Sequence, residues 1–294
     1  MDRVTAEWVL TQRDMRYRRT PALALQSEQD ARSFVDAVGF CFFWPIKDIE
    51  MPNLLHAIAG RVRPAPVKHD DPDGSRCWAW KDGALGKKWW YYGKLLRQRA
   101  TLVSWDLLAA FYASSRNFGG LDDYLQEYRD GLLTVEARQV YEALLEHGAL
   151  DTVRLRKESR MSADGAKARF DRALTELQVG LKVLPVGVAR VGAWRYAFVY
   201  DIVPRYLPDL PEQARRIERR QARQILVGQY VDDVVAVERG MVRRVFHVFG
   251  WTAAEWEQTF AALRQSGVLG EIEVGGWAQP AFLSLRYKSG GGYD

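Results

Sequence analysis

The 294-residue chain has few of the residues that mark disulfide-bonded, metal-binding or membrane proteins. Its only cysteines are Cys41 and Cys77, with no Cys-x-x-Cys pair, which argues against a disulfide scaffold, a zinc knuckle and an iron–sulfur cluster. We expect both thiols to be reduced. No apolar run approaches the ~20 residues that span a bilayer, and the N-terminal residues lack the apolar core of a signal peptide. We therefore expect a cytoplasmic protein without a membrane partner.

Histidine is also scarce, with four in the whole chain. His69 precedes Asp70 and Asp71, but no second ligand pair follows at metal-binding spacing, so a solvated loop is the preferred interpretation. The sequence contains no GxSxG, P-loop, HExxH or zinc-deaminase motif. We predict neither a metal site nor a cofactor.

Positive charge is concentrated in two segments, whereas the rest of the chain is close to balanced. The net charge is +5. Residues 81–99 hold six bases and one acid, and residues 153–172 hold seven bases and three acids. Concentrated positive segments on a nearly neutral chain indicate a polyanionic partner that touches defined elements.

The most regular region runs from Leu132 to Val203. Thr134 can cap a helix that ends before Gly148, a short strand follows at residues 149–150, and Asp151 can cap a short basic helix. These three elements have the lengths expected at the start of a helix-turn-helix.

A third helix is expected to begin at Ser162 and to bury one face at helical spacing. The residues of that face are Phe170, Ala173, Leu174 and Leu177. Two strand-like segments follow at residues 181–189 and 194–203, joined by a turn at residues 190–193. Helix, strand, helix, helix and hairpin is the order of a winged helix-turn-helix.

A second copy of this pattern follows a proline-containing linker. Helices are expected at residues 212–230 and 240–249, and Thr252 with Glu255 forms a capping box for a further helix. The buried face recurs 86 residues later, Phe170, Leu174 and Leu177 corresponding to Trp256, Phe260 and Leu263. A hairpin at residues 268–274 and 277–285 completes the copy. We interpret the two regions as an internal repeat.

The first 130 residues are less regular. Helices are expected at residues 27–38, 52–59, 87–97, 105–114 and 121–130, with a loop at residues 61–74. This region is compatible with a third, divergent winged helix, although periodicity alone does not establish one. The predicted fold class is mainly α with small β-hairpin wings (α+β), built from tandem winged helix-turn-helix domains. The predicted divisions are residues 1–130, 131–205 and 206–288, with a flexible tail at 289–294.

Two sets of residues are candidates for binding nucleic acid. The first mixes cations, which hold phosphates, with aromatic rings, which stack on unpaired bases: Lys87, Lys88, Trp89, Trp90, Tyr92, Lys94, Arg97 and Arg99. The second lies on the expected recognition helix: Lys167, Arg169 and Arg172. The alternatives are that the rings belong to the core and that the helical cations form a solvated face.

The sequence resembles the AlkZ/YcaQ-type winged-helix DNA glycosylases, as a divergent AlkZ-related branch. The resemblance covers roughly residues 31–285 and rests on the segments 38–44 and 94–103 and on the module at residues 170–200. It implies a C-shaped array of three winged helices that holds double-stranded DNA, and excision of bulky alkylated or cross-linked bases.

The catalytic signature of that family is Gln-x-Gln or Gln-x-Asp after a Leu-Gly-Leu-like segment. Phe42 and Trp44 stand at the corresponding positions, and neither can orient a water molecule or stabilise an oxocarbenium ion. The nearest carboxylates are Asp48 and Glu50. They are weak candidates for a substitute catalytic role, and the alternative is that both are surface acids of a loop.

Three hypotheses follow for the function. The first is a monomeric DNA-binding protein of this glycosylase-like branch, connected with DNA repair, in which the usual catalytic pair is absent. The second is an active monofunctional DNA glycosylase that hydrolyses an N-glycosidic bond. The third is a winged-helix transcriptional regulator, which would dimerise on palindromic sites.

Overall fold

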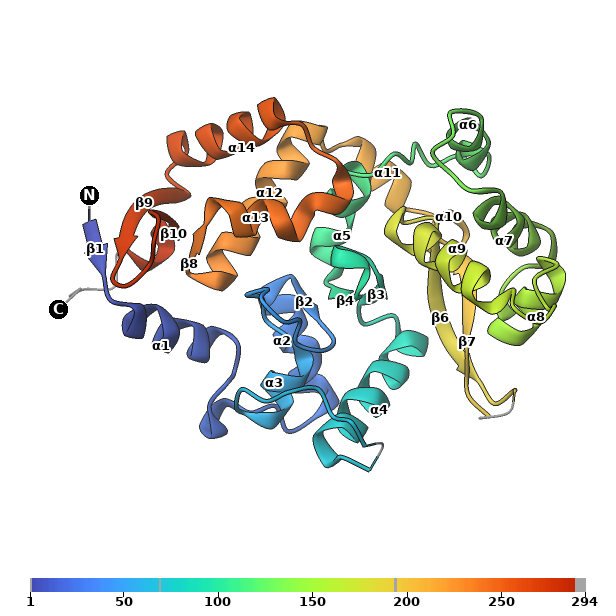
Figure 1. Cartoon of the computed structure of the whole chain (residues 1–294), viewed down its shortest axis with the longest axis horizontal. Coiled ribbons are helices and arrows are strands. Elements are labelled where there is room, and N and C mark those ends of the chain that lie inside the picture. Colours follow the sequence, from blue (N-terminus) through green and yellow to red (C-terminus); the bar gives the residue numbers. More distant parts are fainter. Residues whose placement is uncertain (1, 69, 193–194, 289–294) are drawn as a thin grey trace.

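The computed structural model describes residues 2–68, 70–192 and 195–288, and it is mostly helical with three small sheets (Figure 1). His69, Ala193, Trp194 and the predicted tail at residues 289–294 lie outside the described residues. Among the described residues, no helix combines the length and the apolar character needed to cross a bilayer.

The same order of elements occurs three times. The first unit (residues 28–103) contains α2 Glu28–Val38, β2 Phe40–Phe42, α3 Leu54–Ala59, α4 Pro72–Lys87, β3 Tyr91–Lys94 and β4 Ala100–Val103. The second unit (residues 135–202) contains α7 Val135–His147, β5 Leu150–Asp151, α8 Thr152–Glu158, α9 Lys167–Val179, β6 Val183–Ala189 and β7 Ala197–Ile202. The third unit (residues 219–284) contains α12 Arg219–Val234, β8 Ala236–Glu238, α13 Arg239–Phe246, α14 Ala253–Gln265, β9 Leu269–Val274 and β10 Ala281–Ser284.

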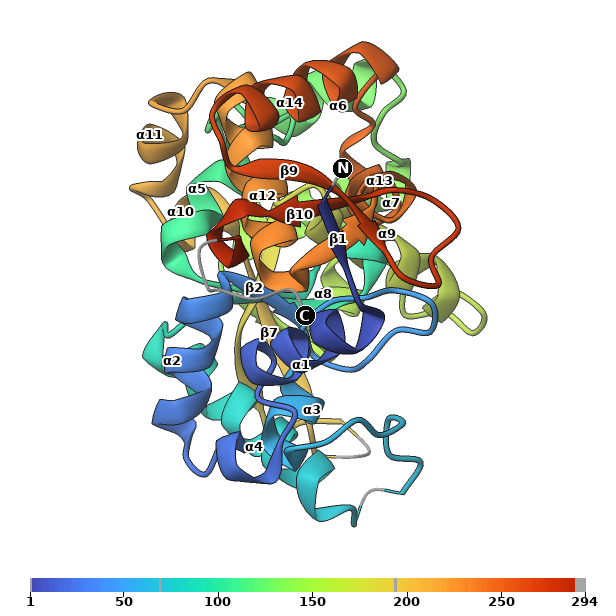
Figure 2. The ribbon, with the colours of Figure 1, turned by 90° about the vertical axis from the view of Figure 1, so that its left-hand side faces the viewer.

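The three sheets share one strand arrangement. In each unit the last strand lies in the middle and pairs antiparallel with both other strands, in the orders β2-β4-β3, β5-β7-β6 and β8-β10-β9. The third sheet gains a fourth strand, because β1 Asp2–Val4 pairs parallel with β9. Figure 2 shows β1 lying beside β9, with α1 Ala6–Arg16 below it.

The remaining elements lie before, between, within or after the units. They are the short helices η1 Pro21–Leu23, η2 Leu96–Gln98, α5 Trp105–Ala113, α6 Asp123–Arg129, α10 Val203–Tyr206, α11 Leu210–Arg215, η3 His247–Phe249 and η4 Leu285–Tyr287. Along the long axis of Figure 1 the third unit, the first unit and the second unit follow one another. The first and third units share the main core, which extends from Tyr17 to Phe282 in the sequence. The domain boundaries drawn from the sequence stay predictions.

Several local predictions are confirmed by the caps. The Thr134 hydroxyl accepts from the Ala137 amide, and Gly148 follows α7 with φ 80°. The Asp151 carboxylate accepts from the first amides of α8, and the capping box of Thr252 and Glu255 opens α14. Because a cap satisfies amides that a helix cannot pair internally, these starts could be predicted from the sequence.

The internal repeat is also confirmed. Helices α9 and α14 each have 13 residues, and α14 lies 86 residues after α9. Strand β9 likewise begins 86 residues after β6. The paired side chains of the two helices are all buried: Phe170, Leu174 and Leu177, and Trp256, Phe260 and Leu263.

Three predicted helices were wrong in extent or kind. The helix expected from Ser162 begins at Lys167, and its N-cap, Ala166, offers no side-chain acceptor. The helix expected over residues 212–230 is two helices, α11 and α12, because the backbone of Glu218 is extended. Residues 87–97 form the end of α4 and strand β3, because Lys88 takes a left-handed conformation with φ 51° and ends α4.

The first sheet separates two cores, which explains how consecutive aromatic residues are buried. Alternate residues of a strand point to opposite faces. Tyr91 therefore enters the main core, whereas Trp90 and Tyr92 enter the first-unit core, which packs between β2–β4 and helices α2 to α4. On a helix these rings could not all have been buried.

Candidate nucleic-acid interface

A strip of cations crosses all three units. It joins α9 of the second unit, the turn between β3 and β4 of the first unit, and α13 of the third unit, and the turn lies between the two helices in Figure 1. We call this surface the basic strip. Its cations are Lys94, Arg97, Arg99, Lys167, Arg169, Arg172 and Arg244, and it also includes the imidazole of His247, which directly follows α13.

The turn of the strip is fixed by its two leucines. Leu95 and Leu96 are completely buried in the main core, so the neighbouring cations point outward. Arg97 and Gln98 have φ values of 54° and 56°, a left-handed conformation that costs free energy for residues other than glycine. This tight turn leaves Lys94 and Arg99 exposed and Arg97 half-buried.

Helix α9 holds the turn from one side. The Lys94 backbone N–H donates to Oε1 of Gln178 at 3.0 Å, and Nζ of Lys94 donates to Oγ1 of Thr175 at 3.1 Å. The outer face of α9 exposes Lys167, Arg169 and Arg172, and the structure thus brings both predicted basic segments together.

Helix α13 meets the turn from the other side. Nη1 of Arg97 lies 3.2 Å from Nδ1 of His247, and the Arg244 guanidinium lies 3.4 Å from the backbone oxygen of Asp48. Burial and then the charge of Arg97 lower the pKa of His247. The sequence analysis predicted a helix at residues 240–249 but did not assign its cations to the candidate site, although Arg243 and Arg244 end a helix that buries Val242, Val245 and Phe246 on its other side.

The other residues that the sequence predicted to contact nucleic acid lie outside the basic strip. Lys87 pairs with Glu28 and stacks over the half-buried Trp89 ring at 4.4 Å, and Lys88 donates to the backbone oxygen of Tyr206. Trp90 and Tyr92 are 2% and 7% exposed, so they fill the first-unit core and offer no ring to a ligand in this conformation.

Phe42 and Trp44, the positions that the sequence resemblance predicts for the family's catalytic pair, are aromatic and packed. Phe42 is 1% exposed and belongs to the main core. Trp44 is half-buried and lies 4.3 Å from the Phe43 ring, measured between centroids. Neither side chain carries a group that could activate water.

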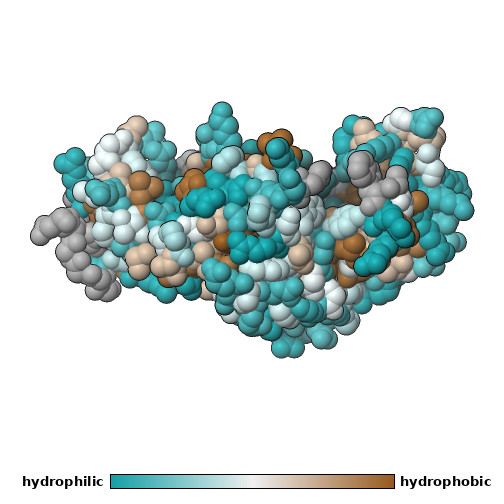
Figure 3. All heavy atoms as spheres, turned by 90° about the horizontal axis from the view of Figure 1, so that it is seen from below, coloured by the Kyte–Doolittle hydropathy of each residue, from teal (hydrophilic) through white to brown (hydrophobic). Residues whose placement is uncertain are grey.

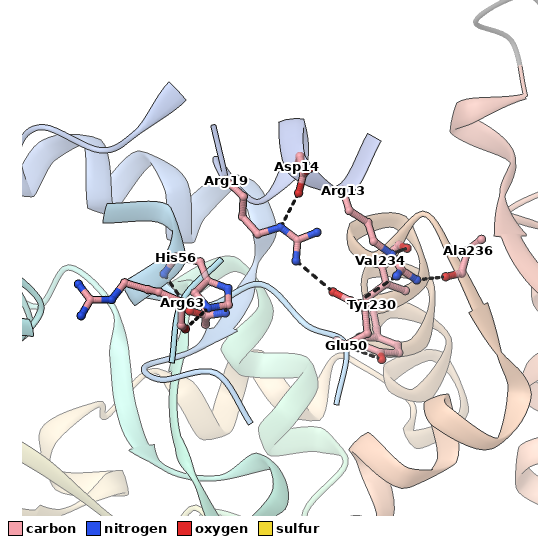
Figure 4. A network of polar contacts seen from close by, with 10 residues as sticks. Arg13, Asp14, Arg19, Glu50, His56, Arg63, Tyr230, Val234 and Ala236 are labelled. Atoms are coloured by element: carbon pink, nitrogen blue, oxygen red, sulfur yellow. Dashed lines mark hydrogen bonds and ion pairs between the residues drawn. The ribbon is translucent and has the colours of Figure 1, made fainter. Parts of the chain in front are cut away.

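Glu50 follows these positions in the sequence and belongs to a network of polar contacts that connects α1 with the third unit (Figure 4). Its Oε2 lies 3.0 Å from Nη1 of Arg13, and its Oε1 lies 3.7 Å from Nη1 of Arg19. Its backbone oxygen accepts from the Tyr230 hydroxyl at 2.8 Å. The carboxylate is thus oriented by two guanidinium groups.

Arg13 is buried, and each of its three guanidinium nitrogens has a partner in this network. Its Nε donates to the backbone oxygen of Val234 at 2.9 Å, and its Nη2 donates to that of Ala236 at 2.6 Å.

Tyr17 is buried near this network. Burial raises the pKa of Tyr17 well above its usual value, and the Tyr17 hydroxyl has no hydrogen-bond partner among the described residues.

A cavity of about 380 Å³ opens beside the Glu50 carboxylate. Its walls are Arg13, Glu50, Val237, Glu238, Met241, Gly276, Trp277 and Ala278. Met241 and Arg244 are one helical turn apart on α13, so the cavity lies next to the end of the basic strip. Asp48 is an exposed residue with φ 59° and lines none of this cavity.

His56 of α3 is held by hydrogen bonds to neighbouring residues. The His56 backbone amide and Nδ1 both bond to Asn53, and Nε2 lies 2.8 Å from the backbone oxygen of Arg63. This assigns the Nε2–H tautomer, because a carbonyl oxygen only accepts. In the described ranges, no group of three or more His, Cys, Asp or Glu side chains could hold a metal ion.

The surface near α3 and α4 is mainly hydrophilic. Seen from below, its hydrophobic residues form small, separate patches between polar ones (Figure 3). Together with the basic strip, this describes an α+β protein of three similar units with a polar surface and a concentration of cations.

Comparison with known proteins places this fold in a family. The model of the AlkZ-related family matches residues 25–247, and the chain belongs to that family. The structure is similar to that of Streptomyces sahachiroi DNA glycosylase AlkZ, with a TM-score of 0.58 and 13% identity over 99% of this chain and 72% of that chain. This likeness concerns the fold. No curated protein matches the sequence.

Proposed function

We propose that the chain is a DNA-binding protein whose three units are winged helix-turn-helix modules that together hold a duplex. The observation that carries the proposal is the basic strip, which has members on elements of all three units. A single module contacts a short stretch of duplex, whereas cations on three modules can follow a phosphate backbone over a longer one. Membership in a family related to a DNA glycosylase supports a connection with DNA repair.

Salt dependence of duplex binding tests the proposal. Each phosphate contact contributes a slope of about −0.9 to log K against log salt. The double variant Arg97→Ala/Arg172→Ala is expected to bind a duplex more weakly and to reduce this slope by about 2, if both side chains contact phosphates. Arg220→Ala is the matched control, because Arg220 is an exposed arginine of α12 outside the strip. No binding by the unmodified protein at low salt would refute the proposal.

A second candidate function is excision of a damaged base, and the cavity at Glu50 favours it. A monofunctional glycosylase hydrolyses the N-glycosidic bond with a water molecule that a carboxylate orients and deprotonates. Glu50 is a carboxylate beside a cavity that borders the strip, whereas Asp48 is exposed and outside it.

Duplexes with N7-alkylguanine, N3-alkyladenine or an interstrand cross-link test this candidate. The expected result is abasic product with the unmodified protein and with Asp48→Asn, and none with Glu50→Gln at equal duplex affinity. Absence of product throughout the panel would leave DNA binding alone. A dimer with one preferred palindromic sequence would instead support the regulator hypothesis.

A further inference from the structure

Two exposed aromatic rings meet where the first and second units touch. Trp78 of α4 is 40% exposed and Tyr196, just before β7, is 39% exposed. Their centroids are 6.2 Å apart with nearly perpendicular planes, and the centroid of the half-buried Trp44 ring lies 6.4 Å from that of Trp78. We call Trp44, Trp78 and Tyr196 the aromatic surface. It shares no residue with the basic strip or the Glu50 cavity.

A buried ammonium group fixes the two exposed rings. The Lys81 side chain is completely buried, and its Nζ lies 4.1 Å from the Trp78 centroid and 5.7 Å from that of Tyr196. The same Nζ donates to the Tyr196 hydroxyl at 3.0 Å and pairs with Oδ1 of Asp82 at 2.6 Å. The Tyr196 hydroxyl in turn donates to Asp82 at 3.0 Å. Rings held this way lose little freedom when a ligand stacks on them.

Cations accompany the aromatic surface on the hairpin of the second unit. Arg190 follows β6 and Arg195 precedes Tyr196, and both are exposed. Exposed rings next to arginines form the combination that binds unpaired nucleotides, since the rings stack on bases and the cations hold phosphates.

We propose that the aromatic surface stacks on an unpaired nucleobase of bound DNA, with Arg190 and Arg195 holding the adjacent phosphates. The inference rests on the proposed duplex binding and adds a second contact to it. The strip holds paired DNA by charge, and the aromatic surface recognises a place where a base has left the stack. Base stacking on a protein ring contributes on the order of 10-fold in affinity.

Two duplexes of one sequence test the inference. One is fully paired, and the other carries a single bulged 2-aminopurine, whose fluorescence is quenched when an aromatic ring stacks on it. The unmodified protein is expected to bind the bulged duplex about 10-fold more tightly and to quench its fluorescence. Trp78→Ala is expected to remove both effects and to leave affinity for the paired duplex unchanged within about 2-fold, and Trp78→Phe to retain most of the quenching.

The control is Phe118→Ala, which removes another exposed ring, 70% exposed and located between α5 and α6. Equal affinity of the unmodified protein for both duplexes, or equal quenching by Trp78→Ala, overturns the inference and leaves the proposed function standing. Loss of the preference in Phe118→Ala as well would also overturn it. No binding to either duplex overturns the proposed function itself.

Discussion

Nη1 of Arg97 lies 3.2 Å from Nδ1 of His247, 150 positions later in the chain. The contact joins the turn of the first unit to the third unit in the middle of the basic strip. Since Arg97 is always protonated, its guanidinium donates and the imidazole nitrogen accepts. The charge of the strip at this point therefore comes from the arginine, and the histidine stays neutral near pH 7.

The first prediction concerns the pKa of His247, which burial and then the charge of Arg97 hold below its usual value. Arg97→Ala removes the second cause, so the pKa should rise toward the ordinary 6.5 of histidine. A proton NMR titration of the imidazole measures this. Arg99→Ala, which removes the neighbouring exposed cation, should change the pKa much less. An unchanged pKa in Arg97→Ala would show that the contact does not persist in solution.

The second prediction concerns the stability provided by Glu50. Glu50→Gln removes the negative charge that faces Arg13 and Arg19 and leaves the buried Arg13 with only its two carbonyl partners. We expect a loss of about 1–3 kcal/mol in the free energy of unfolding, because a buried cation loses its counter-ion. Asp48→Asn is the control and should change stability by less than about 0.5 kcal/mol. Urea unfolding measures both, and equal effects would contradict the proposed network.

The third prediction concerns Lys81. Burial lowers the pKa of this lysine to about 8, although the carboxylate of Asp82 opposes the shift. Between about pH 8 and the ordinary pKa of lysine the unfolded chain binds more protons than the folded chain, so the contribution of Lys81 to the free energy of unfolding rises with pH in that window.

Unfolding of the unmodified protein and of Lys81→Met should be compared at pH 7.5, 8.5 and 9.5. The unmodified protein should gain stability relative to the variant as pH rises, by up to about 3 kcal/mol over the full window. Taking the difference between the two proteins cancels the titration of the tyrosines that do not contact Lys81. A pH-independent difference would mean that the rings around the ammonium, among them Trp78 and Tyr196, offset its burial.

The fourth prediction concerns acid stability and His56. Burial lowers the pKa of His56, and protonated Nδ1 would face the amide of Asn53 as a second donor. Below about pH 6.5 the unfolded chain therefore binds the additional proton, and the free energy of unfolding should decrease as pH falls. His56→Gln can replace one donor and one acceptor but does not titrate, so its unfolding between pH 7 and 5 should depend less on pH. The same pH dependence in both proteins would assign the effect to other groups.

The local start and stop signals of the helices could be predicted from the sequence. Thr134, Asp151 and Thr252 cap helices as their side-chain chemistry requires, and the 86-residue repeat follows from buried positions that recur at helical spacing. The missed elements depended on tertiary contacts. The strand at residues 91–94 has buried residues on both faces, so its sequence shows no alternation that would distinguish it from a buried helix.

The candidate site could be predicted only in part. The sequence shows that residues 94–99 and 167–172 are basic, but only the contact of Lys94 with Thr175 and Gln178 shows that they lie together. The role of Arg13 was not predicted, because its partners Val234 and Ala236 are carbonyl groups more than 200 positions away. Tyr196 was missed for the same reason, since Lys81 and Asp82 lie on another unit.

The parallel pairing of β1 with β9 has a consequence for association between copies of the protein. An unpaired strand edge offers N–H and C=O groups to any other extended chain. Asp2–Val4 occupies the outer edge of β9 along the register from Ile272 to Val274. The first residues thus act as a cover against edge-to-edge aggregation, and a preparation that lost them to proteolysis would expose a template for it.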